Sequence, residues 1–140
     1  MSDSAFVDTN VLVYARDLAA GAKQQRAEAL MAELWETRRG RISVQVLNEY
    51  LVTVTQKLKP GLSRAEAWAD IELYEAWSPT PMDWKLLQSA HRLADAHSLS
   101  WWDALIVATA VSSRCEILYS EGLAHGDVYG GVRVVNPFSD

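Results

Sequence analysis

Short apolar runs alternate with segments of helical periodicity along the chain. Residues 5–7 (Ala-Phe-Val) predict a first strand, and the apolar residues after the polar corner at 8–10 predict a helix. A second helix is expected between Gly21 and Gly40, where apolar residues recur at the i, i+3, i+4 spacing of one helical face: Ala27, Leu30, Met31, Leu34 and Trp35.

The middle of the chain continues this alternation. Residues 41–44 predict a second short strand, and a third helix follows, with an apolar stripe formed by Leu47, Tyr50, Leu51, Val54 and Leu58. Ser63 and Glu66 have the spacing of a capping box, so a fourth helix should begin there. We expect this helix to direct three side chains inward: Trp68, Ile71 and Tyr74.

The last third predicts two more helices and two more strands. A fifth helix is expected over 83–97, and a mostly apolar, therefore central, sixth helix over 98–113. Residues 116–120 and 132–135 predict the last strands, separated by a glycine-rich turn region. The pattern indicates an α/β fold, with helices on both faces of a mostly parallel sheet. Binding sites in such folds lie beyond the carboxyl ends of the strands.

Composition narrows the class of protein. With 140 residues, 49% of them hydrophobic, the sequence predicts a single domain over 1–140. The net charge of −5 argues against binding nucleic acid by phosphate neutralisation alone, but not against binding through a metal ion. No apolar run near the start approaches a membrane span, and acids stand where a signal peptide needs basic residues. We therefore expect a cytoplasmic protein with no membrane segment.

Three acids are candidates for catalysis or metal binding. Two of them have a simpler structural interpretation, and the third would be energetically costly to bury without a partner. Asp8 follows the first predicted strand and could serve only as a helix N-cap, and Asp103 could serve only in a capping box with Ser100. Glu49 lies at the edge of an apolar helical stripe, where a carboxylate is partly desolvated and requires a partner.

Convergence of these acids would favour a divalent cation. Carboxylates that lie close together destabilise one another unless a cation binds between them. Oxygen ligands without histidine or thiolate favour Mg²⁺ or Mn²⁺, and these ions retain waters that support phosphoester hydrolysis.

Three segments also resemble a known family. The segments FVDTNVLVYA, ISVQVLNEY and LSWWDALIVATA are similar to the signature segments of PIN-domain ribonucleases, and most similar to VapC-type toxins of toxin-antitoxin operons. The resemblance implies a three-layer α/β/α sandwich, Mg²⁺- or Mn²⁺-dependent RNA cleavage by an activated water, an antitoxin partner and a homodimer. It places Asp8, Glu49 and Asp103 on the family's metal-binding acids, and Asn10 and Ser43 on supporting polar positions.

One segment departs from the family pattern. A fourth acid commonly stands in a Thr/Ser-x-Asp segment; Ser120 matches this segment, but Gly122 replaces the aspartate. Glu121 and Asp127 are the nearby candidates to substitute for it. Two alternatives to an active nuclease follow: a catalytically weakened PIN-fold protein that binds RNA or an antitoxin, and an interaction module in which the acids only cap helices.

Overall fold

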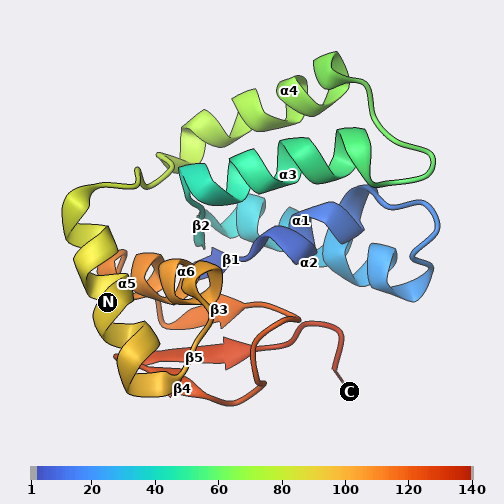
Figure 1. Cartoon of the computed structure of the whole chain (residues 1–140). Coiled ribbons are helices and arrows are strands. Elements are labelled where there is room, and N and C mark those ends of the chain that lie inside the picture. Colours follow the sequence, from blue (N-terminus) through green and yellow to red (C-terminus); the bar gives the residue numbers. More distant parts are fainter. Residues whose placement is uncertain (1–2, 140) are drawn as a thin grey trace.

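A five-stranded sheet lies at the centre of the computed structural model, which describes residues 3–139 (Figure 1). Four strands are parallel, and the edge strand β4 is antiparallel to its neighbour. The spatial order is β2 (Gly40–Arg41), β1 (Ala5–Val7), β3 (Ile117–Tyr119), β5 (Val132–Val135) and β4 (Val128–Tyr129). The prediction of a mostly parallel sheet is therefore confirmed.

Helices cover both faces of this sheet, which confirms the predicted three-layer α/β/α sandwich. The helices are α1 (Thr9–Arg16), α2 (Ala22–Thr37), α3 (Val44–Gln56), α4 (Arg64–Leu73), α5 (Trp84–His97) and α6 (Trp101–Ser112), with a 3₁₀ helix, η1 (Tyr74–Trp77), after α4. Each corresponds to a segment predicted to be helical, except η1. Within residues 3–139, no helix combines the length and the apolar character that crossing a membrane requires.

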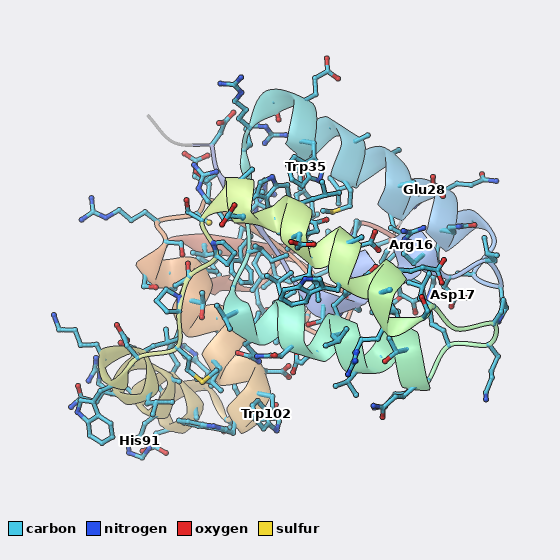
Figure 2. All side chains as sticks on the ribbon, turned by 90° about the horizontal axis from the view of Figure 1, so that it is seen from above. Arg16, Asp17, Glu28, Trp35, His91 and Trp102 are labelled. Carbon is cyan, nitrogen blue, oxygen red and sulfur yellow. The ribbon has the colours of Figure 1, made fainter. Side chains whose placement is uncertain are left out.

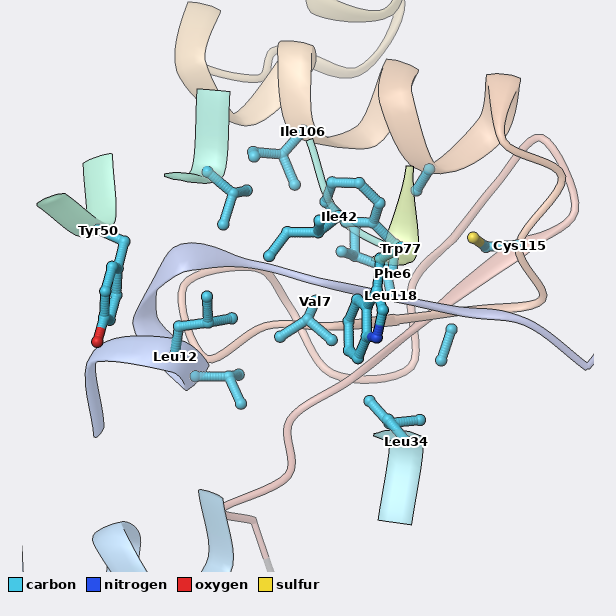
Figure 3. Packing of buried hydrophobic residues seen from close by; sticks show 14 of the residues in the cluster. Phe6, Val7, Leu12, Leu34, Ile42, Tyr50, Trp77, Ile106, Cys115 and Leu118 are labelled. Atoms are coloured by element: carbon cyan, nitrogen blue, oxygen red, sulfur yellow. The ribbon is translucent and has the colours of Figure 1, made fainter. Parts of the chain in front are cut away.

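Buried side chains on both faces of β1 hold the layers together. Phe6 and Val7 are fully buried. In Figure 3, Ile106 of α6 and Leu34 of α2 lie on opposite sides of β1, the strand that carries Phe6 and Val7. Helix α6 is buried around most of its circumference, as its apolar sequence predicts. This position brings the start of α6 toward the end of the sheet where β1 ends.

An aromatic cluster covers the edge of the sheet formed by β2. Trp77 of η1 packs against Trp35 and Tyr74, with ring centroids 4.9 and 5.0 Å away. The indole ring also lies directly over Gly40 of β2, where any β-carbon would overlap it. The absence of a side chain at Gly40 is therefore a packing requirement.

One predicted strand boundary was wrong, and one strand was not predicted. Strand β2 ends at Arg41 rather than at residue 44, because Ser43 adopts the N-cap position of α3 and forms only an isolated bridge with Thr80. Strand β4 lies inside the region predicted to be only a turn. Gly130 and Gly131 both have positive φ, and they form the tight turn that pairs β4 with β5.

One side-chain prediction in α4 was also wrong. Trp68 was expected to point inward, but its side chain is 53% exposed. Helix α4 lies outside α3 and buries Ala67 instead. The capping box of Ser63 and Glu66 is present as predicted.

Candidate functional site

A cavity of about 900 Å³ opens where β1 ends and α1 begins. Segments distant in the chain form its wall: the β1–α1 corner, α3, the start of α6 and the loop after β3. The three predicted acids, Asp8, Glu49 and Asp103, all line this cavity. Asn10, Gln45 and Gly122 line it as well. The fold thus brings the acids to one cavity.

Asp8 is the most buried of the acids, with only 7% of its surface exposed. It is the N-cap of α1, and its Oδ1 accepts a hydrogen bond of 2.7 Å from the Thr9 backbone N–H. Its Oδ2 accepts hydrogen bonds from the Ser120 hydroxyl at 2.8 Å and from Asn10 Nδ2 at 3.5 Å. The capping interpretation is therefore correct, but capping occupies only one carboxylate oxygen.

The environment of Asp8 makes its negative charge costly. Burial raises the pKa of Asp8 from its ordinary value of 3.8 to about 6. The hydrogen bonds from Ser120 and Thr9 oppose this rise, whereas the negative charges of Glu49 and Asp103 add to it. The neighbouring acids thus make the charged form of Asp8 less favourable, and a cation in the cavity would offset this cost.

Glu49 and Asp103 approach the cavity from helices rather than from strands. Glu49 lies on α3, half-buried, and its Oε1 accepts a hydrogen bond of 2.6 Å from the Thr9 hydroxyl. Asp103 lies in the first turn of α6, where its backbone N–H donates to the N-cap Ser100 at 3.2 Å. Thr9 therefore contacts two of the three acids, with its backbone N–H on Asp8 and its hydroxyl on Glu49.

The other predicted polar residues have different positions. Asn10 lines the cavity, and its Oδ1 also accepts a hydrogen bond from the Glu121 backbone N–H. Ser120 is fully buried behind Asp8. Ser43 is buried at the N-cap of α3, where its hydroxyl accepts from the Val46 N–H at 3.2 Å, so it positions the helix that carries Glu49.

Neither substitute for a fourth acid points into the cavity. The Glu121 carboxylate binds Lys23 Nζ at 2.5 Å and accepts a hydrogen bond of 2.7 Å from the Tyr14 hydroxyl. This pairing keeps the pKa of Glu121 below its ordinary value. The exposed Asp127 accepts instead from the Tyr129 hydroxyl at 3.3 Å. Both side chains are engaged away from Asp8.

Gly122 lines the cavity at the position where the family pattern has an acid. A β-carbon there would lie 3.9 Å from Asn10 Nδ2 and 3.9 Å from Ser120 Oγ, both ordinary contacts. The backbone of Gly122 is also outside the left-handed region that favours glycine. The site therefore has room for a side chain that the sequence does not supply.

The cavity wall includes residues that were not predicted as part of the site. Gln45 lies one helical turn before Glu49 on α3, and Lys57 follows the end of the same helix. Trp102 of α6, labelled in Figure 2, is 60% exposed at the cavity. The spacing of four residues between Gln45 and Glu49 could have indicated that both face the same side of the helix.

The donor set fits a hard divalent ion retaining part of its water shell. Within residues 3–139, the side chains do not form a ready-made group of three or more His, Cys, Asp or Glu ligands. Mg²⁺ requires only one or two direct carboxylates and keeps several waters. A buried Asp8 with a raised pKa, beside two further acids, provides such ligands and would be stabilised by the ion.

Comparisons with known proteins agree with this architecture. VapC20 from Mycobacterium tuberculosis, a toxin that cleaves the sarcin-ricin loop, has a similar fold with a TM-score of 0.65 and 23% identity, covering 84% of this chain and 88% of that one. A toxin-antitoxin complex from Klebsiella pneumoniae contains a similar chain, with a TM-score of 0.62 and 22% identity, covering 98% of this chain and 100% of that one. No curated protein sequence matches significantly. The PIN domain family model matches residues 5–129, so the chain belongs to the PIN domain family.

Proposed function

We propose that this protein is a Mg²⁺- or Mn²⁺-dependent endoribonuclease that acts as the toxin of a toxin-antitoxin pair. The observation that carries the proposal is the shared cavity of Asp8, Glu49 and Asp103 in a PIN-family fold. Similarity to an RNA-cleaving toxin and to a toxin-antitoxin complex supports it. The substrates would be RNA molecules in the cytoplasm.

The three acids would hold the ion, and their neighbours would fix the acids. Ser120 and the Thr9 backbone orient the two oxygens of Asp8, and the Thr9 hydroxyl orients Glu49. A bound ion would supply Lewis acidity and an activated water for attack on a phosphodiester. With water as the nucleophile, no side chain needs to form a covalent intermediate, and the RNA 2′-hydroxyl is not consumed.

RNA preference would then depend on contacts around the cavity. The ammonium group of Lys57 can offset the charge of a backbone phosphate near the acids. The exposed indole of Trp102 offers a surface on which an unpaired base can stack. A single-stranded segment placed between these residues would carry a phosphate past Asp8 and Asp103.

A second cavity, of about 730 Å³ between α1, α2 and α4, is the proposed antitoxin surface. Trp35, labelled in Figure 2, lines it, and Leu18 and Leu73 at its rim are 72% and 63% exposed. As the family resemblance implies, an amphipathic antitoxin segment would lie across the acid cavity and place an arginine or lysine among the acids. Another part of the antitoxin would bury apolar side chains in this second cavity. The implied homodimer is tested by light scattering of the purified protein.

The decisive experiment is cleavage of a mixed RNA pool by antitoxin-free protein with Mg²⁺, Mn²⁺ or EDTA. The Asp8→Asn variant is assayed in parallel with the wild type. The matched control is Asp95→Asn, because Asp95 is an exposed aspartate on α5. We expect metal-dependent cleavage by the wild type and by Asp95→Asn, and none by Asp8→Asn. Equal cleavage by the three proteins, or undiminished cleavage in EDTA, would contradict the proposal.

A catalytically weakened PIN protein that binds RNA or an antitoxin is the second candidate. The observation that favours it is the missing side chain at Gly122, together with the engagement of Glu121 by Lys23. Binding of Mn²⁺ without cleavage of any RNA in the pool would select this candidate. A purely structural role for the acids predicts no effect of Mn²⁺ on the melting temperature.

A further inference from the structure

Gln45 has a buried side chain whose polar atoms have no hydrogen-bond partner. Its residue surface is only 6% exposed, and it belongs to the wall of the acid cavity. Neither Oε1 nor Nε2 makes a hydrogen bond within the described part of the chain, and these are the unpaired buried side-chain atoms found there. The amide thus has one acceptor and two donor hydrogens without a protein partner.

An unpaired buried amide is unfavourable for folding alone. Buried polar groups are almost always hydrogen-bonded, because removing them from water without a partner destabilises the folded state. The adjacent Val46 and Leu47 are buried apolar residues, so an apolar side chain would suit this part of α3. The amide therefore requires an explanation outside the packing of the helix.

The position of Gln45 relates it to the acids. Gln45 and Glu49 are four residues apart on α3, so they lie one above the other on the same helical face. Both line the cavity that contains Asp8. Both amide atoms are buried within the wall, so a nucleobase is too large to reach them and a single water molecule is the candidate partner.

We propose that Gln45 is a positioning residue of the metal site, an inference that rests on the proposed function. Its Oε1 accepts a hydrogen bond from the water shell of the divalent ion, and its Nε2 donates to an anionic oxygen of the site. The side chain thereby orients the hydrated ion without adding charge to a cavity that already contains three acids. Binding of the ion supplies the partners that the protein lacks.

The test measures Mn²⁺ affinity by calorimetry and by electron paramagnetic resonance in Gln45→Met, which removes the amide and retains a similar volume. Gln56→Met is the matched control, because Gln56 is exposed at the far end of the same helix. We expect a 10- to 100-fold weaker Mn²⁺ affinity for Gln45→Met, the range typical of groups that orient metal ligands. Gln56→Met should bind as the wild type does.

Thermal unfolding in EDTA separates this role from a structural one. Gln45→Met should melt at the same temperature as the wild type or higher, because it removes an unpaired polar group. If Gln45→Met fails to fold, Gln45→Glu provides the comparison. We expect this variant to bind Mn²⁺ more tightly than the wild type and to have a lower metal-free melting temperature at pH 8.

Three results would overturn the inference. Unchanged Mn²⁺ affinity in Gln45→Met would show that an ordinary water satisfies the amide, while leaving the proposed nuclease intact. Unchanged affinity in Gln45→Glu would do the same. Failure of the wild type to bind Mn²⁺, or equal binding by the wild type and Asp8→Asn, would remove the metal site itself.

Discussion

Neutralising Asp8 should stabilise the metal-free protein at neutral and alkaline pH. The pKa of this carboxyl rises from 3.8 to about 6 on folding, so the folded protein retains a proton that the unfolded chain has released between these values. Stability therefore falls as the pH rises through this window, and the full penalty is present above it. Each tenfold change in acidity corresponds to about 1.4 kcal/mol, which gives a penalty of about 3 kcal/mol.

Asp8→Asn removes this penalty at a smaller cost. Asparagine is as good an N-cap as aspartate, so the hydrogen bond from the Thr9 backbone can persist. The amide nitrogen cannot accept from the Ser120 hydroxyl as Oδ2 does, and this loss costs about 1 kcal/mol. The net expectation is a gain of about 2 kcal/mol in unfolding free energy at pH 8, and a loss of about 1 kcal/mol below pH 4.

Urea unfolding in EDTA, followed by tryptophan fluorescence at several pH values between 4 and 8, measures this difference. Asp95→Asn is the control, since it makes the same chemical change at an exposed carboxylate. An Asp8→Asn variant that is no more stable than the wild type at pH 8, or a stability difference that does not change with pH, would refute this expectation. Adding Mn²⁺ should then stabilise the wild type but not Asp8→Asn.

Substitutions at Gly40, Ser120 and Gly122 should have distinct effects on stability and metal binding. Gly40→Ala should lower the unfolding free energy by about 2 kcal/mol, because its β-carbon overlaps the Trp77 ring, whereas Gly122→Ala should be neutral in the same urea titration. Ser120→Ala should raise the pKa of Asp8 further and weaken Mn²⁺ binding, and unchanged calorimetric affinity would contradict the role given to that hydroxyl. Gly122→Asp should lower metal-free stability at pH 8 relative to pH 5 and increase the amount of Mn²⁺ bound at saturation, which metal titration detects.

Helical periodicity predicted much of the fold because most helices bury one face, whereas α6 was recognised by its continuous apolar sequence. The prediction was weakest where tertiary contacts decide the structure. Strand β2 has only two residues, because Ser43 is needed as the cap of α3, and no pattern within 41–44 distinguishes the two roles. Trp68 has the spacing of a buried residue, but α4 is an outer helix and leaves it exposed.

The site was predicted less completely than the fold. Asp8, Glu49 and Asp103 could be named as candidates because their segments resemble the family's signature segments, and the structure brings all three to one cavity. The orientation of Glu121 could not be identified, since it depends on Lys23, which lies 98 residues away in the sequence. Gln45 was missed because its spacing from Glu49 indicates a shared helical face, but nothing in the sequence indicates that its amide is buried and unpaired.

The hydrogen bond between Ser120 and Asp8 has a consequence for synthesis on the ribosome. The two residues are 112 positions apart in the sequence. Strand β1 is synthesised early, but its neighbour β3 is synthesised only just before Ser120, so the two strands cannot pair until then. At roughly 5–20 residues per second, this delay is roughly 6–22 seconds. The acid cluster therefore cannot assemble during most of translation. Any nuclease activity of this site would arise only after the last strands have left the ribosome.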